Sequence, residues 1–87
     1  MRVFVLIRDS ICHSDNFDIN VRVFNSISEA CATMKKEYNA ELNDWKQSFE
    51  DDEMFEVETS KESMSIWECG RYVENHISWK IEAKDVI

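Results

Sequence analysis

One long run of apolar residues at helical spacing dominates the pattern of this sequence. Its members recur every three or four residues, which places them along one side of a helix; they are Ile27, Cys31, Met34, Tyr38, Leu42, Trp45 and Phe49. Ser26 and Glu29 flank its start with the spacing of a capping box, which satisfies backbone N–H groups of the first turn. Four acidic residues follow at 50–53, where the helix dipole disfavours negative charge. The pattern predicts one helix from Ser26 to about Phe49. A kink near residues 39–43 is an alternative to a straight helix. An unbroken helix would be roughly 35 Å long, which is longer than the predicted strands.

Two stretches before this helix have strand patterns. Residues 3–7 form a continuous apolar run, which is typical of a strand covered on both faces. Residues 17–23 alternate instead, with Phe17, Ile19, Val21 and Val23 separated by Asp18, Asn20 and Arg22. Such alternation predicts a half-buried strand with one apolar face and one polar face. The polar segment 10–16 between the two strands predicts an antiparallel hairpin with a long loop.

Three more strands are predicted after the helix, at 54–59, 64–72 and 76–82. In the first, Phe55 and Val57 face one way and Glu56 and Glu58 the other. A loop at Glu74 and Asn75 joins the last two and sets Gly70 opposite Trp79. This register puts Ile66, Tyr72, Ile77, Trp79 and Ile81 on one face. It also points Glu68 at the core side, so the strand is bulged there or the register is off by one.

Together these elements predict a single α+β domain over residues 1–87. The element order is β-β-α-β-β-β, and a right-handed crossover from the second strand to a parallel third strand skips one position, which the apolar first strand fills. The predicted fold is therefore a two-layer sandwich. It has a mainly antiparallel five-stranded sheet, in the order 2-1-3-4-5, with one long helix packed on one face.

One helix covers one face of a sheet, so apolar side chains remain on the other. The predicted set on that uncovered face is Phe4, Leu6, Trp67 and Cys69, unless the first strand has the opposite parity, which has the same consequence. Exposed apolar patches on small domains commonly mark protein contacts. We therefore expect self-association through the helix-free sheet face, as a homodimer. The alternative is a scatter of single exposed apolar residues, which is normal on protein surfaces.

Charge is the second informative feature, because most of the net charge of −8 lies between residues 41 and 62. The acidic patch comprises Glu41, Asp44, Glu50, Asp51, Asp52, Glu53, Glu56 and Glu58. Its field opposes direct nucleic-acid binding at that surface, which requires Lys and Arg to neutralise phosphates. A basic protein partner is compatible with it.

Composition bounds the compartment and the cofactor chemistry. No apolar run is long enough to span a membrane, and residues 3–7 are too short for a secretion signal. Three cysteines cannot all pair within one chain, which favours reduced thiols and a cytoplasmic location. Gly70 is the only glycine, which excludes phosphate-binding glycine loops. No cofactor is predicted.

Candidate chemical sites are weak. The cysteines at 12, 31 and 69 and the histidines at 13 and 76 lack the spacing of zinc sites, and the acids at 50–53 lack the alternation and central glycine of a calcium loop. We therefore predict no metal site. Cys12 beside His13 is the most plausible reactive thiol, but no oxyanion donor accompanies it. Trp45 and Trp79 are interpreted as core residues, and Trp67 as a contact residue.

The sequence predicts a small acidic non-enzymatic protein-binding module, with a second copy or a basic protein as its partner. A second hypothesis is a phage-type inhibitor that presents carboxylates in place of nucleic-acid phosphates to a basic protein. The charge cluster motivates it. A third hypothesis, a small thiol-dependent enzyme, rests on Cys12 and His13 alone.

Overall fold

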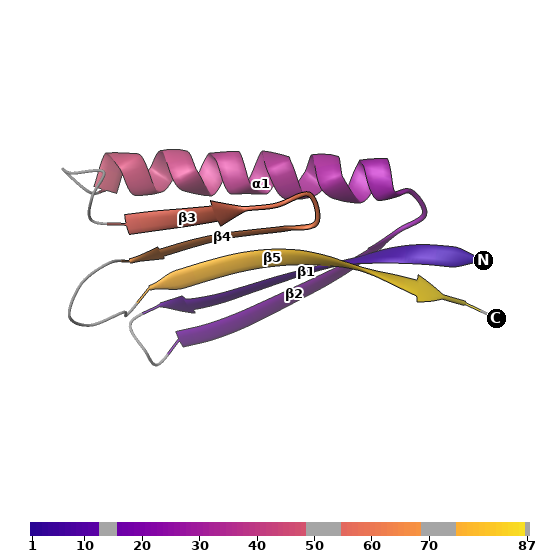
Figure 1. Cartoon of the computed structure of the whole chain (residues 1–87). Helices are drawn as coiled ribbons and strands as arrows, with labels where there is room; N and C mark the ends of the chain where they lie inside the picture. The colour runs from indigo at the N-terminus through magenta and orange to yellow at the C-terminus, as the bar shows by residue number, and fades with distance from the viewer. Residues whose placement is uncertain (13–15, 49–54, 69–74, 87) are drawn as a thin grey trace.

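The computed structural model of the chain describes residues 1–12, 16–48, 55–68 and 75–86. In chain order the elements are β1 (Arg2–Cys12), β2 (Asn16–Phe24), α1 (Ile27–Ser48), β3 (Phe55–Thr59), β4 (Ser63–Glu68) and β5 (His76–Asp85). Figure 1 shows α1 lying lengthwise along one side of a twisted sheet, with both chain termini at the same end. The α+β class and the β-β-α-β-β-β order are as predicted.

The order of strands in the sheet is β2-β1-β5-β4-β3, with every neighbouring pair antiparallel. The predicted order 2-1-3-4-5 is wrong, because the last three strands enter the sheet in reverse. The ten-residue strand β5 lies in the centre and pairs with β1 from Arg2–Asp85 to Ile11–His76. The five-residue strand β3, with four exposed residues, lies at the edge. Short, charged strands suit sheet edges because they discourage pairing with other chains.

The register between β4 and β5 also differs from the prediction. Trp79 lies opposite Met64 and not opposite Gly70, and β4 ends at Glu68. Gly70 and Tyr72 fall outside the described residues. Because the shift is an even number of positions, the described side chains of β4 and β5 keep their predicted faces. Glu68 therefore shares the side of Ile66 as expected, without a bulge: its carboxylate accepts a hydrogen bond from the Asn75 amide at 2.9 Å.

The helix follows the sequence pattern closely. Ser26 caps its start as predicted: the Ser26 hydroxyl accepts hydrogen bonds from the backbone N–H groups of Ser28 (3.2 Å) and Glu29 (3.4 Å), which is the Ser26 half of the predicted capping box. α1 continues through residues 39–43 to Ser48 without a break, and Phe49 lies outside the described residues. The apolar stripe that predicts the helix is also the stripe that packs on the sheet.

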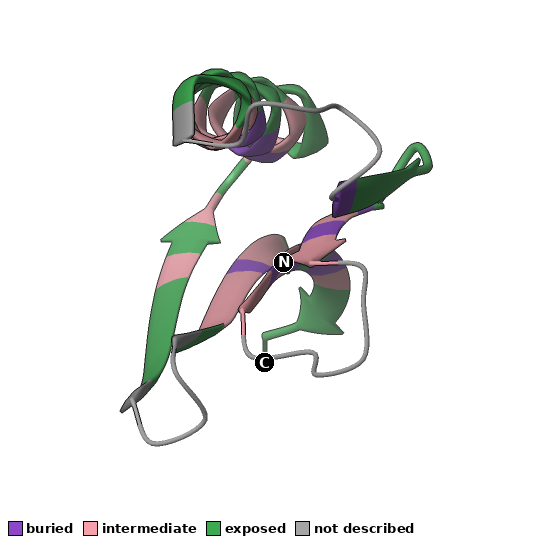
Figure 2. Cartoon of the chain, turned by 90° about the vertical axis from the view of Figure 1, so that its left-hand side faces the viewer, coloured by how far each residue is buried: buried purple, intermediate pink, exposed green. Residues whose placement is uncertain are grey.

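The core lies between α1 and the sheet, as the buried positions in Figure 2 show. Its buried members are Leu6, Ala30, Met34, Tyr38, Phe55, Met64, Ile66, Ile77, Trp79 and Ile81. Trp79 meets Tyr38 edge to face, with ring centroids 6.0 Å apart, and the rings of Trp45 and Phe55 are 5.7 Å apart. Burial raises the pKa of the Tyr38 hydroxyl. Trp79 therefore belongs to the core, as the sequence indicates, and Trp45 is partly buried and packs against it.

Candidate functional site: the helix-free face of the first hairpin

The side of the sheet opposite α1 carries a mostly apolar surface on β1 and β2, with Asp9 as its one charged position. We call it the hairpin face; it comprises Val3, Val5, Ile7 and Ile11 of β1 and Phe17, Ile19, Val21 and Val23 of β2. Cross-strand register pairs Val5 with Val23, Ile7 with Val21 and Ile11 with Phe17. The four β2 side chains are 54% to 63% exposed. In the part of the chain that the structure describes, α1 is the one helix, and it lies on the other side (Figure 2).

This arrangement corrects two sequence-based predictions. Leu6 is fully buried in the core and Phe4 packs against that core, so neither lies on the helix-free face. The opposite parity of β1, which the sequence left open, is the one observed. The apolar side of residues 17–23 was expected to be buried, and it faces solvent instead.

Paired charges explain why the hairpin is oriented this way. The guanidinium of Arg22 donates hydrogen bonds to both carboxylate oxygens of Glu37 on α1. Arg8 of β1 donates to Glu41 at 3.4 Å, one helical turn further along. Turning the hairpin over would break both ion pairs and would carry Leu6 out of the core. The even-numbered side of the hairpin is thus bound to the helix, and its odd-numbered apolar side is left outside.

Glu37 is the centre of this polar layer. Besides Arg22, it accepts a hydrogen bond from the Trp79 indole N–H at 3.2 Å. The hydrogen bond from Arg22 is the main cause that holds the pKa of Glu37 below its ordinary value, and burial opposes it. The same hydrogen bond raises the pKa of Arg22. Both groups therefore stay charged at neutral pH and act as a structural link.

Charge along the hairpin face is low and balanced. Asp9 interrupts the apolar side of β1, and the Ser78 hydroxyl of β5 donates a hydrogen bond to its carboxylate. Glu82, further along the same side of β5, forms ion pairs with Lys80 at 3.4 Å and with Lys84 at 3.5 Å. The hairpin face is therefore bordered on β5 by charged side chains that pair with one another. It does not include the strongly acidic part of the chain.

Trp67 is the one residue of the predicted interaction set that the structure places on the helix-free side. It alternates with the buried Ile66, pairs with His76 and Glu56, and is partly exposed. Cys69 lies outside the described residues. The hairpin-face residues were missed because their strand alternation was interpreted as a buried face. The sequence signal that could have identified them is the presence of Arg8 and Arg22 on the even-numbered side of the two strands. These two residues pair with Glu41 and Glu37 of the helix.

The predicted acidic patch is only partly described. Residues 50–53 lie outside the described ranges. Asp44, Glu56 and Glu58 are exposed, whereas Glu41 is half-buried beside Arg8. At least one of its carboxylates is therefore engaged within the chain. Whether the patch binds a basic protein stays a prediction.

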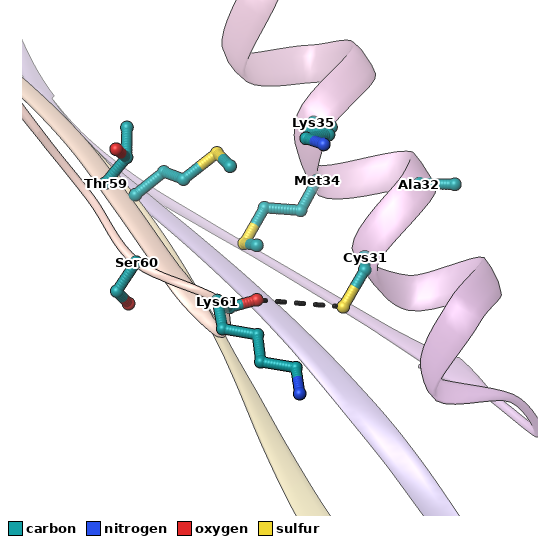
Figure 3. Close-up of a pocket in the computed structure, with 8 residues that line it drawn as sticks. Cys31, Ala32, Met34, Lys35, Thr59, Ser60 and Lys61 are labelled. Carbon is teal, nitrogen blue, oxygen red and sulfur yellow. Dashed lines mark hydrogen bonds between the residues drawn. The ribbon is translucent and has the colours of Figure 1, made fainter.

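A groove of about 600 Å³ runs between the first half of α1 and the β3–β4 turn. Figure 3 shows the Cys31 thiol aimed at the backbone carbonyl of Lys61, to which it donates a weak hydrogen bond at 3.8 Å. Met34 and Met64 line the groove, and Lys35 and Lys61 contribute two cations. In the described ranges, no group of three His, Cys, Asp or Glu residues lies close enough to hold a metal ion. His13 lies outside those ranges, and for Cys12 the structure describes the backbone alone.

Comparison with known proteins adds no assignment: neither a protein family, nor a curated relative, nor a solved structure matches this chain. Among the described residues, the one helix is too polar to cross a membrane.

Proposed function

We propose that this chain is a non-enzymatic, cytoplasmic protein-binding module that self-associates, with the hairpin face of one copy packed on that of a second. The observation that carries the proposal is that β2 turns its whole apolar side outwards, at 54% to 63% exposure. Large exposed apolar patches on small domains mark contact surfaces. Two sheets pack face to face when each presents such an apolar side. The free thiol of Cys31 fits a reducing compartment.

Electrostatics favour a second copy as the occupant. Two chains of net charge −8 repel each other over most approaches. The hairpin face avoids this repulsion because Asp9 is hydrogen-bonded within its own chain and Glu82 is neutralised by two lysines. A strongly basic partner, by contrast, would gain more from the exposed acids of β3 and α1 than from this surface.

The size of the surface sets the expected affinity. Two neighbouring strands about 30 Å long and about 4.8 Å apart present roughly 300 Å². A standard stable interface buries about 800 Å² on each partner. We therefore expect the hairpin face alone to support weak association, in the micromolar range, which responds strongly to a buried charge.

The test is sedimentation equilibrium of Ile11→Lys beside the unchanged chain, up to high micromolar concentration. Ile11 lies on β1, inside the sheet, so this substitution places a charge on the hairpin face without touching an edge strand. An uncompensated charge buried in an interface costs enough to weaken association at least tenfold. Val57→Lys is the matched control, because Val57 is 43% exposed on β3, away from the hairpin face. A monomer at all concentrations, or equal association of both variants, would overturn the proposal.

A further inference from the structure

The two edges of the sheet are protected very differently. β3 is five residues long, and its exposed side chains include Glu56 and Glu58. β2 is nine residues long, contains no proline or lysine, and has a continuous row of exposed side chains from 17 to 21. Proteins usually blunt sheet edges with short strands, charges, proline or bulges, because an open edge pairs with other chains. The β3 edge follows this rule by being short and acidic, whereas the β2 edge is long and carries one charge of each sign, Asp18 and Arg22.

The sequence of β2 is complementary to itself when it is reversed about Asn20. In an antiparallel pair of two β2 strands centred there, Asp18 of each copy lies opposite Arg22 of the other. On the other side of the strand, Ile19 lies opposite Val21 and Phe17 opposite Val23. Opposite charges and apolar pairs directly across a ladder are the favourable cross-strand combinations. Asn20, at the centre, is also the midpoint of the strand Asn16–Phe24.

Other two-fold registers lose this match. A two-fold axis through an antiparallel pair makes one residue face its own copy, so each register is named by its central residue. Centring on Asp18 or on Arg22 sets like charges opposite each other, which is destabilising. In a register centred on Ile19 or Val21, Asp18 of one copy no longer lies opposite Arg22 of the other. The pairing of opposite charges therefore favours the register centred on Asn20.

From these observations we propose that the β2 edge is an interface for a second copy of this chain. The two β2 strands pair antiparallel about a two-fold axis at Asn20, and the two five-stranded sheets become one continuous sheet. Because the axis is perpendicular to the sheet, both helices lie on the same side and both hairpin faces on the other. Arg22 keeps its hydrogen bonds to Glu37, and about a third of its side chain remains exposed to meet Asp18.

The edge interface does not depend on the proposed face-to-face packing, but it would enlarge the apolar surface available for that packing. Edge pairing sets two hairpin faces side by side, which doubles the apolar area to roughly 600 Å², closer to a standard interface. If both interfaces form, their perpendicular two-fold axes close the assembly as a tetramer. If only one forms, the assembly is a dimer.

The experiment is a cross-linking assay on the full chain under mild oxidation. Asn20→Cys places a thiol at the axis, where residues directly across an antiparallel ladder have Cβ atoms about 5 Å apart, close to the reach of a disulfide. Asp18→Cys is the matched control, because position 18 faces position 22 and lies about 13 Å from its own copy. We expect rapid dimer formation for Asn20→Cys, with the new bond joining position 20 of both copies by mass spectrometry. The unchanged chain controls for its native cysteines.

A charge variant separates the two proposals. Asp18→Arg sets two guanidinium groups opposite each other, and we expect its association to weaken at least tenfold at low salt. Asp44→Arg makes the same charge change on an exposed part of α1 and should leave association intact. Cross-linking no faster for Asn20→Cys than for Asp18→Cys would overturn the edge interface. If Ile11→Lys still weakened association in that case, the hairpin-face proposal would stand. If instead Asn20→Cys cross-linked rapidly and Ile11→Lys had no effect, only the edge interface would stand.

Discussion

At the scale of single residues, Glu37 joins the helix to two different strands of the sheet. It projects from α1 and accepts hydrogen bonds from Arg22 of β2 and from the Trp79 indole of β5. Such charge-assisted hydrogen bonds are stronger than neutral ones, and removing one partner leaves the others unsatisfied. One carboxylate thus ties the helix to both the edge and the centre of the sheet.

We predict that Glu37→Gln lowers the free energy of unfolding by about 1 to 2 kcal/mol at neutral pH. The amide keeps the shape of the side chain and loses the charge that Arg22 binds. Urea denaturation followed by tryptophan fluorescence measures the difference. Asp44→Asn, which makes the same chemical change at an exposed helix position, should alter stability by less than about 0.5 kcal/mol.

The same residue gives a pH dependence whose sign follows from its pKa. The pKa of Glu37 is lower in the folded chain than its ordinary value of 4.5, chiefly because Arg22 donates a hydrogen bond to it. Its stabilisation is therefore complete above about pH 4.5 and is lost as pH falls through the folded pKa. The gap between the unchanged chain and Glu37→Gln should close on acidification. A gap that stayed constant from neutral pH to pH 3 would contradict this role of the charge.

At the scale of elements, the helix depends on local signals and is the part that sequence reasoning predicts best. Its cap is at Ser26, and its apolar stripe needs no knowledge of distant residues. We predict that Ser26→Ala lowers the free energy of unfolding by about 1 kcal/mol, because two backbone N–H groups lose their acceptor. Thermal or urea unfolding measures this effect. Ser28→Ala, in the exposed first turn, is the control, and equal losses for both variants would mean that the cap contributes nothing.

The orientation and order of the strands were not predictable in the same way. Alternation in β2 shows that one side is apolar, but it does not say which side meets the helix. That choice depends on Arg8 and Arg22, whose partners Glu41 and Glu37 lie 33 and 15 residues away in sequence. The sheet order was likewise missed because local patterns do not specify neighbours. A usable signal existed in strand character: β3 is short and charged, as edges are, and β5 is long with buried Ile77, Trp79 and Ile81.

At the scale of the whole molecule, the central pairing of β1 with β5 joins the two ends of the chain. The backbone N–H of Val86 donates to the carbonyl of Met1 at 2.7 Å, and Arg2 pairs with Asp85. All contacts along this ladder span most of the sequence, so the two ends of the chain must come together for it to form. Long-range pairings of this kind slow folding.

This topology predicts the pattern of native-state hydrogen exchange. β1 and β5 each have a neighbour on both sides, whereas β3 pairs with β4 alone and exposes four of its five residues. Amides in the middle of β5, such as that of the buried Trp79, which lies opposite Met64 of β4, should exchange only through global unfolding. Paired amides of β3 should exchange at least tenfold faster through local opening. Exchange followed by two-dimensional NMR measures both in one sample. If β3 amides were as protected as those of β5, β3 would have to lie inside the sheet, as in the order 2-1-3-4-5. Slow amide exchange in β5 together with fast exchange in β3 is the result expected when β5 lies at the centre of the sheet and β3 at its edge.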